Sequence, residues 1–220
     1  LASHPNLPNF QSEQLTPDAT LNQRHLAGNG CHVMNNDRVV QLKKSGRLVA
    51  PVALHNLPDY TKPDWTGILM CYFSDDNGKS WRRSKTTLKT FDKDGKRVTT
   101  QEPGVVELKD GRLIMVTRPD GGVLYSKDKG ATWTESPTTL VPRPKFKAPQ
   151  IFVLRDGTLV AVATWGNLRA WISKNDGRTW SKDIPLDTSV YGYPGGLVLD
   201  DESILVSYCQ SGRAPNRVYV

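Results

Sequence analysis

Long apolar runs and helical periodicity are both missing from this 220-residue sequence. No apolar stretch approaches the length that crosses a membrane, so no membrane segment is expected. No stretch of useful length carries apolar residues at helical spacing, which leaves strands as the expected regular structure. Four prolines at positions 137, 142, 144 and 149 also rule out a helix in that connection. The sequence therefore predicts an all-β protein.

Cysteine is scarce as well, with three residues, Cys31, Cys71 and Cys209. An odd number without metal-like spacing argues against a disulfide framework or a metal site, and it does not reveal the compartment. We expect the cysteines to pack as small apolar residues, and we expect no metal or other cofactor. No signal peptide is visible. Because the first residue is Leu and not Met, we expect the chain to start inside a longer precursor.

Acidic residues are outnumbered by basic ones, 22 to 29, which gives a formal net charge of +7. This balance favours anionic partners, either nucleic acid or acidic glycans. The basic residues are scattered among predicted turns and form no dense run, so no nucleic-acid partner is expected. The number of subunits does not follow from the sequence.

One unit is present four times, a pair of apolar strands joined by a tight turn. In the clearest copy, residues 105–108, apart from Glu107, and residues 113–116 are apolar, and Lys-Asp-Gly turns the chain between them. The other copies surround the turns at residues 42–48, 154–159 and 199–204. A period of roughly 45 to 65 residues with about four short strands is typical of propeller blades.

Three of these units are followed by the pattern Ser-x-Asp-x-Gly-x-x-Trp or a near match, at residues 74–81, 126–133 and 173–180. The third has Asn175 in place of the aspartate. Ser and Asp side chains bond nearby amides, Gly takes the positive-φ position and Trp packs between strands. These boxes are expected to staple hairpins and not to take part in chemistry. We expect residues 1–29 to be an irregular N-terminal segment and residues 30–220 to form about four blades of a partial propeller.

Equivalent positions in the repeats indicate where a site lies. Six residues before the Leu of each turn stand Asn36, Glu102, Ala148 and Tyr193. The first strand of each propeller blade lines the axis, so these positions should surround one mouth of the channel. We therefore expect Glu102 and Tyr193 to face one shared pocket.

A second set of equivalent positions lies ten residues after the same Leu, at Arg118, Thr164 and Cys209. Only Arg118 is charged. Both Glu102 and Arg118 stand at the outer ends of one hairpin, which brings them to the same rim. The alternative is that Arg118 only forms a salt bridge at the rim with Glu107 or Asp120.

These residues resemble the sialidase (neuraminidase) superfamily, whose Asp-box (BNR-repeat) propellers have six blades. The patterns at residues 36–42 and 102–108 are similar to those of bacterial sialidase-like proteins. Glu102 stands sixteen residues before Arg118, as in sialidases, and Tyr193 stands six before Leu199. The resemblance runs from about residue 33 to the C-terminus.

The resemblance implies an exo-α-sialidase-like glycoside hydrolase that releases terminal sialic acid, or a related acidic 2-keto sugar, with retention. Tyr193 would be the nucleophile and Glu102 its general base. Arg118 would belong to a triad of arginines that binds the substrate carboxylate, Arg169 is the candidate for another, and Asn36 would contact substrate. A neutral tyrosine avoids the repulsion that an anionic nucleophile meets at the sialic acid carboxylate; such sialidases are a known exception among glycosidases.

The chain also departs from the family pattern. Its blades correspond to the family's third to sixth, so the acid/base Asp and a further arginine of the first blade are unassigned, and we expect the isolated chain to be inactive. Asp37 and Arg38 would shape the rim, and Trp165 and Tyr191 would pack. Two alternatives remain: a non-catalytic carbohydrate-binding or scaffold propeller, and a glycosidase for another acidic sugar. We expect a secreted or periplasmic location.

Overall fold

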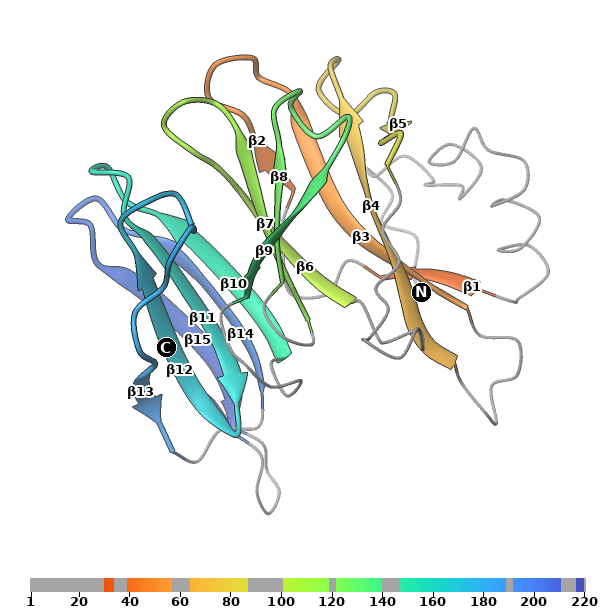
Figure 1. Ribbon diagram of the computed structural model, residues 1–220. Coiled ribbons are helices and arrows are strands. Elements are labelled where there is room, and N and C mark those ends of the chain that lie inside the picture. Colours follow the sequence, from red (N-terminus) through yellow and green to blue (C-terminus); the bar gives the residue numbers. More distant parts are fainter. Residues whose placement is uncertain are drawn as a thin grey trace, which may run out of the picture.

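The computed structural model describes residues 30–33, 39–56, 64–86, 101–118, 122–139, 147–188, 192–210 and 217–219. All regular structure in these ranges is β-strand, grouped into four antiparallel sheets. The sheets follow one another in chain order and fan out side by side, from the orange and yellow sheet to the blue one (Figure 1). The all-β prediction is confirmed. The segment 1–29 lies outside the described residues.

Each sheet corresponds to one sequence repeat. Sheet 1 contains β1 (Gly30–Val33), β2 (Val40–Gln41), β3 (Leu48–Asn56), β4 (Asp64–Ser74) and β5 (Arg82–Arg83). Sheet 2 contains β6 (Gln101–Glu107), β7 (Leu113–Arg118), β8 (Gly122–Ser126) and β9 (Thr134–Thr139). Sheet 3 contains β10 (Lys147–Val153), β11 (Leu159–Trp165), β12 (Asn167–Ser173) and β13 (Ile184–Asp187). Sheet 4 contains β14 (Gly192–Val198), β15 (Ile204–Gln210) and β16 (Arg217–Tyr219).

Sheet 1 differs in detail from the other three sheets. Its second strand, β3, pairs with two separate short strands, β1 and β2. The pairing of β2 covers only Val40 and Gln41, and residues 37 and 38 lie outside the described ranges. The other three sheets are simple meanders in which each strand pairs with the next along the chain.

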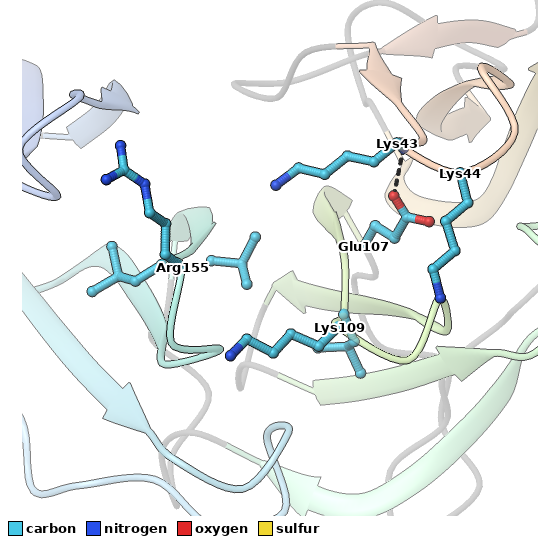
Figure 2. A pocket seen from close by; sticks show the side chains of 8 residues that line it. Lys43, Lys44, Glu107, Lys109 and Arg155 are labelled. Atoms are coloured by element: carbon cyan, nitrogen blue, oxygen red, sulfur yellow. Dashed lines mark hydrogen bonds between the residues drawn. The ribbon is translucent and has the colours of Figure 1, made fainter.

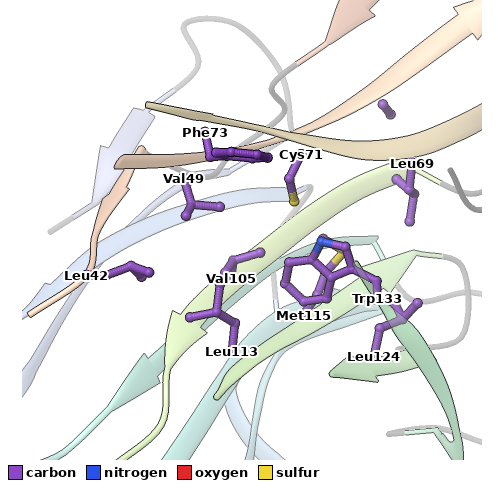
Figure 3. Close-up of a cluster of buried hydrophobic side chains, with 11 residues drawn as sticks. Leu42, Val49, Leu69, Cys71, Phe73, Val105, Leu113, Met115, Leu124 and Trp133 are labelled. Atoms are coloured by element: carbon purple, nitrogen blue, oxygen red, sulfur yellow. The ribbon is translucent and has the colours of Figure 1, made fainter. Parts of the chain in front are cut away.

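Side chains that alternate along the strands fill the spaces between neighbouring sheets. In β6, Val105 packs toward sheet 1 whereas Val106 packs toward sheet 3. Figure 3 shows the first of these cores, in which Cys71 is fully buried in one cluster with Met115 and Trp133. This confirms for Cys71 the expected role as a small apolar residue; the side chains of the other two cysteines are not described. Sheets 2 and 3 each have a neighbouring sheet on both sides, so both of their faces are buried.

The two remaining cores follow the same scheme. Between sheets 2 and 3, Ile114 and Val116 meet Ile151 and Trp171, all with 1% exposure or less. Between sheets 3 and 4, Phe152 and Leu168 meet partly buried side chains of sheet 4, namely Val198, Ile204, Val206 and Tyr208. Sheet 4 thus packs on sheet 3 through one face.

The boxes form the predicted staples. In the second, Ser126 Oγ accepts a hydrogen bond from Gly130 N (2.8 Å), and Asp128 Oδ1 accepts one from Thr132 N (2.8 Å). Trp133 is buried and its Nε1 donates to the Gly130 carbonyl (3.1 Å). Burial alone raises the pKa of Asp128, but hydrogen bonds from Thr132 and Ser126 outweigh it and lower that pKa. The first box repeats these bonds, and donors from Ser80 and Ser74 lower the pKa of Asp76 to about 2.

The third box shows what the aspartate-to-asparagine change does. Asn175 Oδ1 still accepts from Thr179 N (2.9 Å), but its Nδ2 now donates to Thr179 Oγ1 (2.8 Å), where an aspartate accepts. In this box Trp180 Nε1 is buried without a hydrogen-bond partner among the described residues. The staple therefore survives the substitution with one donor unsatisfied.

Candidate functional site

The predicted ring positions share an unusual backbone conformation. Glu102, Ala148 and Tyr193 have φ values of 53°, 53° and 58° although none is glycine. Each lies where the pairing register of the first and second strands shifts, that is, in a β-bulge. Each precedes a proline, which lacks the N–H that regular pairing would need. The equivalence of the three positions, inferred from sequence spacing, is confirmed.

The second set of equivalent positions is confirmed too. Just before each bulge the first strand pairs with the end of the second strand: Gln101 opposite Arg118, Lys147 opposite Thr164, and Gly192 opposite Cys209. Arg118 therefore stands beside the bulge of its own sheet, as the hairpin geometry predicts.

The structure brings Glu102 and Arg118 together. Arg118 Nη1 donates to Glu102 Oε1 (3.1 Å) and to Gln101 Oε1 (3.2 Å). The Glu102 side chain is 2% exposed and that of Arg118 is 27% exposed. The alternative partner Glu107 is at the far end of β6, where its Oε2 accepts from Lys43 N; Asp120 lies outside the described residues. Arg118 thus presents a partly exposed guanidinium edge above a buried carboxylate.

A residue that the sequence analysis did not single out completes this arrangement. Ala148 N donates to Glu102 Oε2 (2.5 Å), and this bond is buried between sheets 2 and 3. Both oxygens of Glu102 are therefore engaged, one within its own sheet and one across to the next. An alanine side chain has no functional group, so only the equivalence of Ala148 to Glu102 and Tyr193 in the repeats indicated that it lies near the site.

Tyr193 occupies the same bulge in sheet 4, and its side chain is 49% exposed. Strand β10 lies between β6 and β14 and contacts both. Glu102 and Tyr193 thus stand at the same end of their strands, with sheet 3 between them. The pocket that they are expected to share remains a prediction.

The other predicted site residues are placed differently or not at all. Arg169 lies on β12, the third strand of sheet 3, and its Nη1 is paired with the Asp183 carboxylate. Its contact with substrate remains a prediction. Asn36, the further ring position, lies outside the described residues.

The structure also gathers basic residues that are separated in the sequence. Lys43, Lys44, Lys109 and Arg155 line one pocket of about 220 Å³ at the turns that join first and second strands. Sequence analysis treated these residues as scattered. The signal was available, since Lys43, Lys109 and Arg155 each directly follow the Leu that precedes a turn.

Neither a metal centre nor a membrane span is found within the described ranges. No group of three or more His, Cys, Asp and Glu side chains there is arranged to hold a metal ion. No helix there is long and apolar enough to cross a membrane.

The repeated bulges, boxes and sheets are matched by a family model. The model of the BNR repeat-like domain matches residues 13–206, most of the chain. The chain belongs to the BNR repeat-like family. A search of curated proteins finds no match.

Solved structures of similar fold include sialidases. A protein of unknown function from Dyadobacter fermentans superposes with a TM-score of 0.62 at 19% identity, over 82% of this chain and 58% of that one. Trypanosoma rangeli sialidase, in a covalent complex with 2,3-difluorosialic acid, superposes with a TM-score of 0.59 at 20% identity, over 80% of this chain and 29% of that one. A mutant of NanB sialidase from Streptococcus pneumoniae superposes with a TM-score of 0.56 at 19% identity, over 77% of this chain and 26% of that one.

This BNR repeat-like chain therefore spans 58% of the first of these structures and less than a third of the two sialidases. At such identities the similarity establishes a sialidase-like fold. The predicted resemblance to BNR-repeat, sialidase-like proteins is confirmed by the family match together with the fold.

Proposed function

We propose that this chain forms four blades of a six-bladed sialidase-like propeller that hydrolyses glycosides of sialic acid or of a related acidic 2-keto sugar. The observation that carries the proposal is the shared bulge, which holds Glu102 and Tyr193 at equivalent positions of their sheets, with Arg118 beside Glu102. Three non-glycine residues in a strained conformation at the same point of three repeats are typical of a functional rim.

The proposed reaction retains configuration in two steps. In the first, Tyr193 Oη forms a bond to the anomeric carbon, the bond to the aglycone oxygen breaks and Glu102 takes the tyrosine proton. In the second, water attacks the anomeric carbon and the bond to Tyr193 Oη breaks. Glu102 returns the proton to Tyr193, and the proton lost by the water goes to the group that protonated the leaving oxygen. The acid that protonates the leaving oxygen is not assigned to any residue here.

Glu102 can take this part while it accepts hydrogen bonds. Each carboxylate oxygen can accept two hydrogen bonds, and Arg118 and Ala148 donate to different oxygens of Glu102. The same bonds fix the orientation of the carboxylate. The proposal requires the Tyr193 hydroxyl to come within hydrogen-bond distance of Glu102, about 2.6–3.2 Å, when substrate is bound.

Arg118 is the proposed partner of the substrate carboxylate. Its Nη1 is used by Glu102 and Gln101, whereas its Nη2 and Nε make no hydrogen bond to the described residues. Two parallel N–H groups on a planar guanidinium match the two oxygens of a carboxylate. In this proposal Arg169 and Asn36 contribute further substrate contacts from the neighbouring blades.

Closure into a propeller is supported by the outer face of sheet 4. Gly196 and Val198 face sheet 3, so Leu197 points the other way, where it is 49% exposed. An apolar side chain at this position in sheets 2 and 3 is buried by the next sheet. A further blade packed on sheet 4 would bury Leu197.

The test is hydrolysis of a sialic acid glycoside with a fluorogenic aglycone by the full-length protein. Tyr193→Phe should lower kcat by at least about a thousandfold, as removal of a nucleophile does. Tyr208→Phe is the matched control, because it removes a hydroxyl from the same sheet, one that donates to Asp187. Incubation with 2,3-difluorosialic acid should leave a covalent adduct on the peptide that contains Tyr193, detected by mass spectrometry. Equal activity of Tyr193→Phe and the wild type would remove Tyr193 as the nucleophile.

A second candidate, a non-catalytic carbohydrate-binding propeller, is favoured by one observation. The positions equivalent to Arg118 hold Thr164 and Cys209, and Arg169 is engaged by Asp183, so one arginine stands at the bulges of the described sheets. A wild-type protein that binds acidic sugars without hydrolysing any of a panel of sialic acid, deaminated and shorter 2-keto acid glycosides would establish this alternative.

A further inference from the structure

The basic pocket lies at the opposite end of the sheets from Glu102 and Tyr193. Strand β6 begins with the bulge and ends at Glu107, which lines the pocket, and β10 likewise runs from Ala148 to Val153. Glu107 stands five positions after Glu102, which corresponds to roughly 16 Å of strand at about 3.3 Å per residue. The pocket is therefore a separate place from the proposed active site.

The lining is strongly cationic. Three lysines and one arginine, contributed by the turns of sheets 1, 2 and 3, surround a single carboxylate, that of Glu107. Figure 2 shows the side chains of Lys43 and Lys109 extending from separate turns toward the side of Arg155, whereas Lys44 extends along the other side of Glu107. The Glu107 carboxylate is itself engaged, since its Oε2 accepts a hydrogen bond from Lys43 N (2.6 Å). The formal charge of the lining is thus +3.

The nearby acidic groups form their hydrogen bonds with other residues. Asp110 is bonded to Arg112, and Asp156 is bonded to the backbone and hydroxyl of Thr158. The positive charges of Lys44 and Lys109 act on Asp110 and Asp156, respectively, from beyond ion-pair distance. The four positive charges of the lining repel one another, and the single lining carboxylate, that of Glu107, offsets only part of this repulsion.

Two of these lysines lie against glycines of the neighbouring turns. Lys109 lies across the turn of sheet 3, where a Cβ on Gly157 would stand only 3.1 Å from its Cδ, so the glycine makes room for it. Lys44 lies across the turn of sheet 2, where a Cβ on Gly111 would stand 3.8 Å from its Nζ, an ordinary contact distance. Each lysine stem is thus seated on the next sheet's turn, which restricts its conformations and reduces the entropy lost on binding.

Arg155 is held in place by an ion pair and a hydrogen bond to sheet 4. Its Nε pairs with Glu202 (3.1 Å) and its Nη2 donates to the Asp200 carbonyl (2.7 Å). Its Nη1 makes no hydrogen bond to the described residues. The guanidinium is therefore oriented and keeps one terminal nitrogen for a ligand.

We propose that this pocket binds a phosphate monoester on a compact, sugar-sized group. The +3 lining suits a dianion better than a single carboxylate, and Lys and Arg are the usual phosphate partners. Leu108, Val153 and Leu154 add an apolar surface against which the carbon skeleton of the ligand packs. A volume of about 220 Å³ is below the 300–1,000 Å³ or so of drug-sized ligand sites, so the ligand is a single small unit.

The test is calorimetric titration of the full-length protein with glucose 6-phosphate, glucose 6-sulfate and glucose at low ionic strength. Glucose 6-phosphate should bind, glucose should not, and the monoanionic sulfate should bind more weakly. The double variant Lys43→Glu/Lys109→Glu should weaken binding by at least about tenfold, because both ammonium groups act at short range. Lys127→Glu/Lys182→Glu, which changes the net charge equally at exposed lysines outside the pocket, should leave it unchanged.

Glu107→Gln is expected to increase the affinity, a result that partial unfolding of the variant would not produce. Glutamine keeps an oxygen to accept the Lys43 N–H and removes the negative charge of the lining, so binding should become severalfold tighter. Tyr193→Phe should bind glucose 6-phosphate as the wild type does, which separates this inference from the proposed hydrolase. Absence of binding to wild type, equal affinity for the sulfate, or insensitivity to Lys43→Glu/Lys109→Glu would each overturn the proposal.

Discussion

The backbone N–H of Ala148 and the carboxylate of Glu102 join two neighbouring sheets through a buried hydrogen bond of 2.5 Å. Glu102 also pairs with Arg118 within its own sheet. The side chain of Glu102, at the bulge, thus binds the arginine beside it and connects sheet 2 to sheet 3. A residue proposed for chemistry is also part of the packing between sheets.

Glu102→Ala should therefore destabilise the protein, by about 1–3 kcal/mol, because it leaves the buried Ala148 N–H without an acceptor. Glu102→Gln retains an oxygen for that N–H and should cost less. Urea denaturation of both variants measures the difference. Equal losses for the two would show that the hydrogen bond from Ala148 contributes nothing measurable.

The aspartate of the second box should tolerate asparagine but not alanine. In the third box Asn175 keeps the bond from Thr179 N and exchanges the direction of the hydroxyl bond. Asp128→Asn can do the same with Thr132, whereas Asp128→Ala leaves Thr132 N without its acceptor and should cost about 1–3 kcal/mol. Thermal unfolding of the two variants checks this; an asparagine variant as unstable as the alanine one would contradict it.

Acid should destabilise the fold through the boxes. Folding lowers the pKa of Asp76 to about 2 from 3.8, and it also lowers the pKa of Asp128. Below about pH 4 the unfolded chain takes up protons that the folded chain does not, so protonation favours unfolding. Stability should be constant above about pH 5 and fall as the pH drops through 4 toward 2. Melting temperatures measured over this range should fall less steeply for Asp76→Asn than for wild type.

Two glycines with nearly the same backbone conformation allow the cost of backbone strain to be measured apart from the cost of steric overlap. Gly166 and Gly177 have φ values of 78° and 79°. A Cβ on Gly166 meets nothing within 4 Å, whereas one on Gly177 overlaps Ile114 Cδ1 and approaches Tyr125 Oη at 3.2 Å. Gly166→Ala should cost about 1–2 kcal/mol from the left-handed conformation alone, and Gly177→Ala should cost at least about 1 kcal/mol more from overpacking. Denaturation of the pair tests this, and equal costs would show that Ile114 yields freely.

The repeat explains how much of the fold was visible in the sequence. Alternation of apolar residues with turns predicts strands, and the spacing of Leu108, Leu154 and Leu199 predicts which positions are equivalent. Both depend on local geometry that recurs in every sheet, so one sequence was enough. The bulge itself was not predicted, because a residue before proline is normally extended, and the opposite conformation here follows from pairing with the second strand.

The sequence by itself determined the strands, the staples, the shared register of Glu102, Ala148 and Tyr193, and the placing of Arg118 beside Glu102. Only the tertiary structure decided what these residues contact. The bond from Ala148 to Glu102 crosses 46 positions of chain, and the pocket of Lys43, Lys109 and Arg155 draws on three sheets. Such contacts depend on how closely and at what angle the sheets pack, which is set by the sum of many buried side chains and not by any local pattern.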